Sequence, residues 1–272
     1  MRSIFISGAG RSGTSLLHSL LATSNSICAL PETSIVRRHL LSPFSRSSIH
    51  ALHNDSRLSR LAVSTETLAL LSRELTVEKS ILAIIDAHIS MSIPHQKDGI
   101  EFICDKDPLY TFHVPALSRL APDSFLIHII RDPIDTVYSR MKADWSSHQS
   151  IFYSSLITSA AQLYCHLMSL IFFRNRYFLV EYERLIRDPE QTLNKIFGYL
   201  GIPSVSFDKI EQQRRAVSEQ LVSSEEMQWK SKILDPIDSS NLGKGHRALP
   251  SHVKTVISCI CLPYYIIRRH SR

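Results

Sequence analysis

Short runs of apolar residues alternate with longer stretches of helical periodicity along this chain. The short runs predict strands at residues 4–7, 102–104, 125–130 and 177–180, with a further short one ending near residue 29. The longer stretches predict helices at residues 14–22, 33–41, 77–91, 133–142, 152–173 and 189–200. Strands that alternate with helices are typical of a parallel sheet covered on both faces. The pattern therefore predicts an α/β fold with a central parallel sheet flanked by helices.

The composition is that of a globular protein, and the charge favours anionic partners. Hydrophobic residues make up 44% of the 272 residues and charged residues 21%, which excludes disordered, collagen-like and coiled-coil chains. A net charge of +6 suits nucleotides or acidic surfaces, but it is too small to indicate nucleic-acid binding, so no nucleic-acid partner is expected. The five scattered cysteines predict neither a disulfide framework nor a metal site, and they favour a reducing, cytoplasmic location.

The length predicts one domain over residues 1–272, in which residues 204–272 form a mainly helical C-terminal portion. The uncharged segment 151–173 is long enough to span a bilayer, yet its serines, Gln162 and His166 favour a buried helix instead. No export signal precedes the first strand, and no transmembrane segment is expected. Apolar residues beside the basic C-terminus, residues 268–272, leave a weak contact with anionic lipid open.

A turn rich in glycine follows the first predicted strand. Three of the eight glycines, Gly8, Gly10 and Gly13, fall within six residues, so successive amides can converge on a phosphate or sulfate. One template is the dinucleotide fingerprint, with Glu32 as the ribose-binding carboxylate of an NAD or FAD oxidoreductase. The other is the P-loop, in which Thr14 stands where the lysine is usual. Spacing alone leaves both open.

The polar residues inside the turn separate the two templates. Arg11, Ser12, Thr14 and Ser15 supply a cation and three hydroxyls, which suit a charged terminal oxyanion. Residues 6–17 resemble the 5′-phosphosulfate loop of sulfotransferases that use 3′-phosphoadenosine 5′-phosphosulfate (PAPS). This resemblance implies a three-layer, P-loop-like fold, PAPS as co-substrate without a metal, and binding of PAPS by residues 10–15, namely Gly10, Arg11, Ser12, Gly13, Thr14 and Ser15.

The resemblance extends to a second anchor for the 3′-phosphate. Arg131 follows a buried strand and Ser139 lies on the next helix, in the positions of the family's 3′-phosphate motif. Tyr182 matches a residue near the nucleotide, and Lys244 and Arg247 fall in the segment that resembles the donor-closing loop near the C-terminus. The sequence departs from the family at Gly245, where related enzymes usually carry tryptophan, so the packing of this loop is the weakest part of the match.

Three residues are candidates for the chemistry. The Pro31-Glu32-Thr33 segment resembles the family's catalytic glutamate, which makes Glu32 the expected general base. Arg11 and Lys106, the latter in a Lys-Asp-Pro triplet, are the expected cations for the leaving phosphate. Each has a structural alternative: Glu32 as a helix cap, Lys106 as an ion-paired surface residue, and Arg11 as a surface arginine.

The sequence therefore favours a PAPS-dependent sulfotransferase that acts on a hydroxyl-bearing acceptor. Carbohydrate, tyrosine and lipid hydroxyls all remain open, because the loops 42–55 and 88–99 that would choose the acceptor carry no recognisable code. Two other hypotheses stand beside it: an NAD/FAD-dependent oxidoreductase, and a non-catalytic protein of the sulfotransferase fold that binds nucleotide or a partner.

Overall fold

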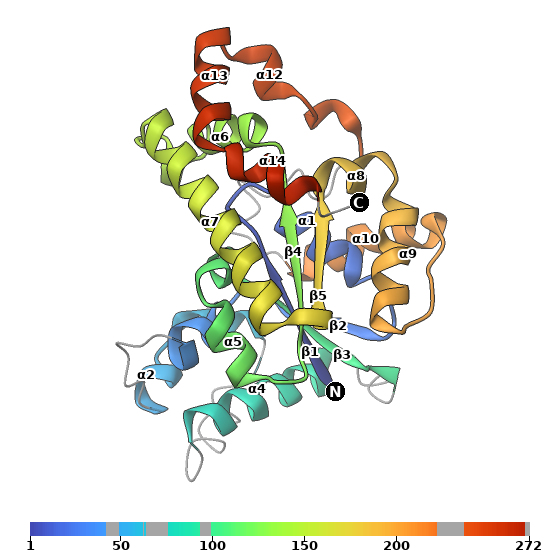
Figure 1. Cartoon of the computed structure of the whole chain (residues 1–272). Helices are drawn as coiled ribbons and strands as arrows, with labels where there is room; N and C mark the ends of the chain where they lie inside the picture. The colour runs from blue at the N-terminus through green and yellow to red at the C-terminus, as the bar shows by residue number, and fades with distance from the viewer. Residues whose placement is uncertain (42–48, 62, 64–75, 93–98, 222–236, 270–272) are drawn as a thin grey trace.

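A five-stranded parallel sheet forms the centre of the chain (Figure 1). The computed structural model describes residues 1–41, 49–61, 63, 76–92, 99–221 and 237–269. The strands are β1 (Arg2–Ser7), β2 (Ile27–Ala29), β3 (Phe102–Lys106), β4 (Phe125–Ile130) and β5 (Tyr177–Glu181). Their order is β2-β3-β1-β4-β5, and every neighbouring pair is parallel. The predicted α/β class and parallel sheet are thus confirmed.

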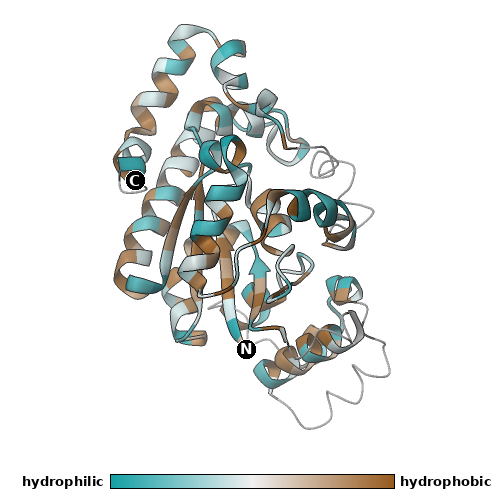
Figure 2. Cartoon of the chain, turned by 90° about the vertical axis from the view of Figure 1, so that its right-hand side faces the viewer, coloured by the Kyte–Doolittle hydropathy of each residue, from teal (hydrophilic) through white to brown (hydrophobic). Residues whose placement is uncertain are grey.

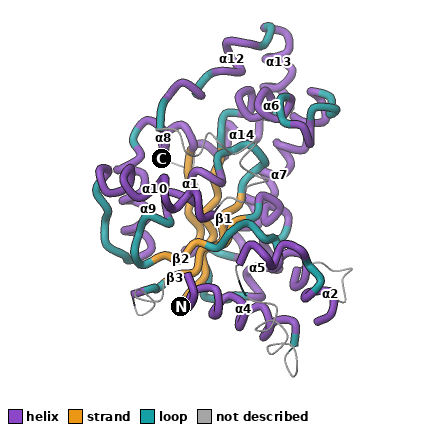
Figure 3. The backbone as a smooth tube through the Cα atoms, turned by 180° about the vertical axis from the view of Figure 1, so that it is seen from behind, coloured by secondary structure: helices purple, strands orange, loops and turns teal. Residues whose placement is uncertain are grey.

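Alternate residues of the sheet enter two separate cores, which makes the fold three-layered. In β1, Phe5 belongs to one hydrophobic cluster, whereas Ile4 and Ile6 belong to the other. Helices α4 (Val77–Ser92), α5 (Val114–Leu120) and α7 (Ile151–Phe172) contribute to the first cluster. The second cluster receives residues from α1 (Thr14–Leu21), α8 (Tyr182–Arg187), α9 (Pro189–Leu200) and α10 (Phe207–Leu221). Figure 2 shows the strands as mostly hydrophobic, and Figure 3 shows α1, α9 and α10 on the face opposite to α7.

Most of the predicted helices are present, and their ends follow local sequence signals. These helices are α1 (Thr14–Leu21), α4 (Val77–Ser92), α6 (Pro133–Met141), α7 (Ile151–Phe172) and α9 (Pro189–Leu200). The side chains of Asp132 and Asp188 accept hydrogen bonds from first-turn amides of α6 and α9, each followed by proline at the first helical position. Helix α9 ends at Gly201, which adopts a left-handed conformation with φ of 76°.

Further helices lie outside the predicted set. They are α2 (Ile49–His53), α5 (Val114–Leu120), α8 (Tyr182–Arg187), α10 (Phe207–Leu221), α12 (Lys244–Ala248), α13 (Ser251–Ile260) and α14 (Leu262–Arg269). Short 3₁₀ segments span Ser56–Leu61, Pro108–Phe112, Asp144–Ser146, Arg174–Arg176 and Ser239–Asn241. The described part of residues 204–272 is mostly helical, while residues 222–236 lie outside the described residues.

Two local predictions between residues 33 and 55 are wrong in part. The expected helix at residues 33–41 begins only at Ile35, because Ser34 has φ of 57°, and it winds as a π-helix over Arg37–Leu41. Residues 49–53 form α2 rather than a loop, and residues 42–48 lie outside the described residues. Asp55 anchors this region, since it accepts hydrogen bonds from Arg38 and His39 of the π-helix.

Helix α7 has an inverted distribution of polar and apolar side chains. Its serines, Gln162 and His166 are buried, as predicted, whereas Phe152, Leu156 and Ile171 are about half exposed or more. The helix packs on α5, α6, α13 and α14. Among the described residues it is the one helix whose length and composition would allow it to cross a membrane. The prediction of a buried helix therefore holds for one face only.

The carboxylate of Asp135 joins helix α12 to α6. Asp135 of α6 accepts hydrogen bonds from the amides of Gly243 and Gly245, each at 2.7 Å. A Cβ at position 245 would lie 2.5 Å from the carbonyl oxygen of Ile134, so α12 approaches α6 too closely for any side chain there. The departure from the family at Gly245 is thus matched by close backbone packing.

The buried imidazole of His128 in β4 makes the stability of the fold sensitive to acid. It contacts Gln162 and the hydroxyl of Tyr177, and burial lowers its pKa to about 3. Below pH 6.5 the unfolded chain binds a proton that the folded chain does not, so this group destabilises the fold as the pH falls. The expected loss is up to about 1.4 kcal/mol per pH unit between these two pKa values. We expect His128→Gln to show the smaller loss of unfolding free energy on acidification in urea titrations.

The quantity to measure is the free energy of unfolding of the wild-type protein minus that of His128→Gln, as a function of pH. Asp105, whose pKa burial raises to about 6, titrates in the same range with the opposite sign in both proteins. Identical pH dependences would show that His128 is not the responsible group.

Candidate active site

A large cleft opens at the carboxyl edge of the sheet. It has a volume of about 1190 Å³ and is lined by the turn after β1, the ends of β3 and β4, helices α6 and α7, and residues 237–244. This edge is where parallel α/β sheets bind their ligands. The predicted residues Gly10, Arg11, Gly13, Thr14, Ser15, Glu32, Lys106, Arg131, Ser139, Tyr182 and Lys244 all line it.

The glycine turn is packed against its neighbours without space for side chains. A Cβ at Gly8 would lie 2.5 Å from the carbonyl oxygen of Ile129, and one at Gly13 would lie 2.4 Å from the ring of Tyr182. Gly13 also has φ of 98°, which favours glycine. Helix α1 begins directly after it, so the first amides of α1 lie at the cleft.

Among residues 10–15, Ser12 is the one that does not line the cleft. Its side chain is fully buried, and its hydroxyl accepts a hydrogen bond of 3.2 Å from the side-chain amide nitrogen, Nε2, of Gln162 in α7. This hydroxyl therefore points to α7 and not into the cleft. Its role is to fix the turn to α7.

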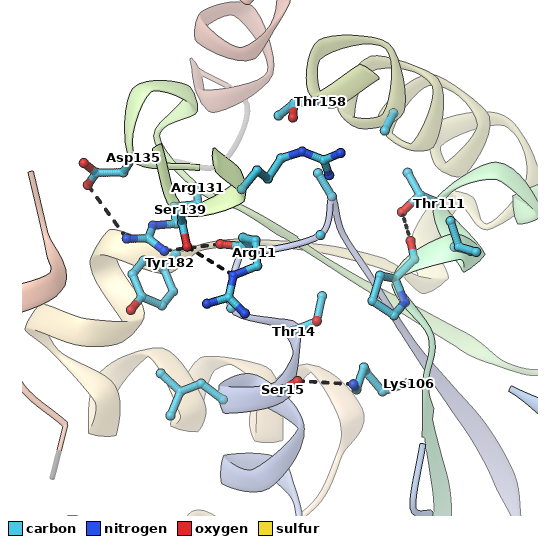
Figure 4. A pocket seen from close by; sticks show the side chains of 18 of the residues that line it. Arg11, Thr14, Ser15, Lys106, Thr111, Arg131, Asp135, Ser139, Thr158 and Tyr182 are labelled. Atoms are coloured by element: carbon cyan, nitrogen blue, oxygen red, sulfur yellow. Dashed lines mark hydrogen bonds and ion pairs between the residues drawn. The ribbon is translucent and has the colours of Figure 1, made fainter. Parts of the chain in front are cut away.

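Arg11 comes together with Arg131 and Ser139, which lie more than 100 residues further along the chain (Figure 4). Arg11 Nε donates to Ser139 Oγ at 3.1 Å, and Arg131 Nη1 donates to the carbonyl oxygen of Arg11 at 3.2 Å. The guanidinium of Arg131 also lies 4.5 Å above the ring of Tyr182 and donates to the carbonyl of Asn241. The two anchors that the sequence predicted separately thus form one cluster.

This cluster carries more positive than negative charge. Burial and the neighbouring Arg131 lower the pKa of Arg11. Asp135 lies 4.0 Å from Arg131, yet the buried Nε of Arg131 has no hydrogen-bond partner among the described residues. A buried guanidinium donor without an acceptor costs free energy that a bound anion would recover. The cluster is therefore suited to binding phosphate or sulfate.

Lys106 and Glu32 form the opposite side of the cleft. Lys106 Nζ pairs with the Glu32 carboxylate and donates to Ser15 Oγ at 3.2 Å. The Lys106 side chain is 3% exposed and that of Glu32 20%, so the pair is not a surface ion pair. The two aspartates beside Lys106 have other partners, since Asp107 pairs with Arg37 and Asp105 accepts from Tyr110.

The C-terminal segment contributes one of its two predicted cations. Lys244 lines the cleft, and its ammonium donates to Asn241 Oδ1 at 2.7 Å. Arg247 is exposed, does not line the cleft, and donates to the carbonyl of Ser240. Arg247 therefore lies in solvent outside the cleft, because the close approach at Gly245 holds α12 against α6.

About two thirds of the residues that line the cleft were not predicted from the sequence. They include aromatic, apolar and polar residues on the 3₁₀ segment after β3, the end of α6 and α7, among them Phe112, Arg140, Trp145, Tyr153 and Thr158. The available signal was the set of hydroxyl residues within an otherwise apolar α7. Among the described residues, no group of three or more His, Cys, Asp or Glu is placed to hold a metal ion.

Known proteins with similar sequence are sulfotransferases. The chain is 28% identical over 205 residues to protein-tyrosine sulfotransferase 2 of Gallus gallus, which covers 73% of this chain and 51% of that protein. It is 25% identical over 206 residues to protein-tyrosine sulfotransferase of Drosophila melanogaster, covering 74% of this chain and 38% of that protein. The chain thus spans about half, or less, of the length of these relatives.

The fold is also shared with a solved structure. The sulfotransferase domain of the Synechococcus PCC 7002 olefin synthase superimposes with a TM-score of 0.60 at 20% identity, covering 97% of this chain and 94% of that chain. The model of the sulfotransferase family matches residues 3–207, which include the glycine turn, Glu32, Lys106 and Arg131. With the family match extending over most of its length and over these cleft residues, the chain belongs to the sulfotransferase family.

Proposed function

We propose that this protein transfers a sulfuryl group from PAPS to a hydroxyl group of an acceptor. The observation that carries the proposal is the cluster of Arg11, Arg131 and Ser139, with the partnerless Nε of Arg131, beside a glycine turn at the carboxyl edge of the sheet. ATP lacks a 3′-phosphate, so a second buried cationic site beyond the turn favours PAPS over ATP.

The residues fit such a donor at both of its charged ends. The turn and the first amides of α1 would hold the 5′-phosphosulfate, with Thr14 and Ser15 as hydroxyl donors. Arg131 and Ser139 would hold the 3′-phosphate, and Lys244 adds a further cation beside them. The ring of Tyr182, stacked on Arg131, would contact the nucleoside between these two ends.

The chemistry needs a proton acceptor and positive charge at the leaving group. The acceptor oxygen forms a bond to sulfur while the bond from sulfur to the 5′-phosphate oxygen breaks, which releases 3′,5′-adenosine bisphosphate. Glu32 takes the proton of the acceptor hydroxyl. Lys106 and Arg11 stabilise the negative charge that develops on the leaving phosphate. Because Lys106 contacts both Glu32 and Ser15, one ammonium links the base to the turn.

The oxidoreductase hypothesis explains less of the cleft. A dinucleotide site would use Glu32 for the ribose, but this carboxylate pairs with Lys106 in the cleft, and the cluster around Arg131 would have no role. A non-catalytic binding protein would need neither Glu32 nor Lys106 at the cleft, yet both line it. Sulfuryl transfer uses all of these residues.

The acceptor and the cellular setting are parts of the same proposal. Tyrosine is the first acceptor to test, because the curated relatives are named protein-tyrosine sulfotransferases, and carbohydrate and lipid hydroxyls follow. A cytoplasmic location is supported by five cysteines that are all free, one of them, Cys259, exposed. Exposed Leu262 and Ile266 of α14, near Arg268 and Arg269, support a weak contact with anionic lipid.

Binding of 3′,5′-adenosine bisphosphate tests the donor site. We expect the wild-type protein to bind this product more tightly than ADP or NAD in calorimetric titrations at one salt concentration. Arg131→Ala should weaken the binding by about tenfold or more, because a charge-assisted hydrogen bond to the 3′-phosphate is lost. Arg215→Ala is the matched control, since Arg215 is an exposed arginine of α10 outside the cleft.

Two results would contradict the donor assignment. Binding of NAD as tight as that of the bisphosphate would restore the oxidoreductase hypothesis. Equal affinity for ADP and the bisphosphate would show that no 3′-phosphate site exists.

Replacement of Glu32 tests the proposed base. Glu32→Gln should lower turnover with radioactive PAPS and a tyrosine peptide or sugar acceptor by about 100-fold or more, since general base catalysis contributes factors of that order. Affinity for the bisphosphate should change far less. The exposed-surface control is Glu219→Gln on α10, outside the cleft, which should retain full activity. Unchanged turnover in Glu32→Gln would remove Glu32 as the base.

A further inference from the structure

Arg140, the residue after Ser139 on α6, is a buried cation that the proposed chemistry does not use. Its residue is 7% exposed, and it lines the cleft. Arg140 Nη2 donates to Gln149 Oε1 at 2.9 Å, and the guanidinium lies 4.9 Å from the centre of the Trp145 ring. No carboxylate pairs with Arg140 among the described residues, and its buried Nε has no hydrogen-bond partner there.

A buried guanidinium without a counter-ion is costly to the fold. Burial lowers the pKa of Arg140, in agreement with this lack of an opposite charge. The contacts with Gln149 and Trp145 hold the group in place but neutralise none of its charge. A bound anion would both accept from Nε and supply the missing charge.

Helix α7, which packs on α6, supplies the cleft with a second partnerless polar group. Thr158 of α7 is 3% exposed, lines the cleft, and its hydroxyl has no hydrogen-bond partner among the described residues. Figure 4 shows Thr158 across the cleft from Ser15 and Lys106. A Cβ at Gly10 would lie 3.4 Å from Arg140 Nη1 and 3.2 Å from the Trp145 ring, so the guanidinium lies beside the glycine turn.

The chemistry of this wall suits an organic acceptor rather than the donor. The residues proposed for PAPS and its leaving group lie on the turn, at the ends of β3 and β4, at Ser139 of α6, and at Tyr182 and Lys244. The wall around Arg140 is instead formed by Trp145, Tyr153 and Ile157, which offer aromatic and apolar surface. A cation within such a wall fits a molecule with an apolar or ring-shaped body and one anionic group.

We propose that Arg140 and Thr158 form a subsite that binds a carboxylate or sulfate group of the acceptor and so selects anionic acceptors. The proposal rests on the proposed function, because it assumes that the acceptor enters beside the donor site. Arg140 is then a specificity-determining residue, with Trp145 and Gln149 as the residues that position it.

The test compares acceptors that differ only in charge. Protein saturated with 3′,5′-adenosine bisphosphate is titrated calorimetrically with matched anionic and neutral compounds. The phenol pair is 4-hydroxyphenylpropionate and its methyl ester. The sugar pairs are glucuronate and glucose, and a sulfate ester of glucose and glucose itself. We expect at least one anionic member to bind about tenfold or more tightly than its neutral partner, as a charge-assisted hydrogen bond would give.

Substitutions assign this preference to the subsite. Arg140→Gln should abolish the preference, Arg140→Lys should retain part of it, and Thr158→Val should reduce it without removing a charge. Lys142→Gln is the matched control, because Lys142 is an exposed cation at the end of the same helix that also lines the cleft. It should change the preference by less than about threefold, since solvent and salt screen an exposed charge.

Each result has a separate meaning for the two proposals. Absence of bisphosphate binding in the wild-type protein would contradict the proposed function. Normal bisphosphate binding without any preference for anionic acceptors would overturn the subsite alone. Equal effects of Arg140→Gln and Lys142→Gln would show a general field of the cleft, and weaker bisphosphate binding in Arg140→Gln and Thr158→Val would place Arg140 in the donor site; either would overturn the subsite.

Discussion

The close approach of the turn after β1 to the end of β4 is the constraint on which the site depends. The carbonyl of Ile129 and the ring of Tyr182 lie where side chains at Gly8 and Gly13 would have to be. This approach brings the backbone of Arg11 within hydrogen-bond distance of Arg131, 120 residues further along the chain. The central position of β1 in the sheet then places β3, with Lys106 at its end, on the other side of the same turn.

The cleft consequently holds buried cations whose charge the neighbouring acids offset only in part. Nearby acids are largely engaged elsewhere: Asp135 with the amides of α12 and Asp107 with Arg37. Two buried guanidinium nitrogens, one on Arg131 and one on Arg140, lack acceptors among the described residues. Such an arrangement destabilises the empty protein and favours anionic ligands, which is the usual compromise between stability and function at a binding site.

Local sequence patterns were sufficient to predict many of the residues of this site. The glycine spacing, the strand before Arg131 and the segment around Glu32 each carry their own pattern, and all line the cleft. These segments meet because each follows a strand of a parallel sheet. The carboxyl ends of such strands lie at the same edge whatever the conformation of the connecting loops.

Local patterns could not predict the positions of side chains that depend on packing between helices and strands. Ser12 belongs to the motif by its position, but the packing of α7 turns its hydroxyl to Gln162. Arg247 is basic and close to Lys244, yet the contact of Gly245 with α6 leaves it in solvent. Arg140 and Thr158 face the cleft only because α6 and α7 pack side by side, which no spacing along one helix reveals.

The two amides that bind Asp135 have a consequence for the modularity of this fold. The family match ends at residue 207, whereas Gly243 and Gly245 lie beyond it, and Asp135 is 2% exposed. A chain ending at residue 207 would leave this carboxylate facing the gap left by α12, without its two donors. The C-terminal helices are therefore an integral part of this fold. The buried carboxylate of Asp135 lies inside the matched segment, whereas the two amides that donate to it lie outside that segment.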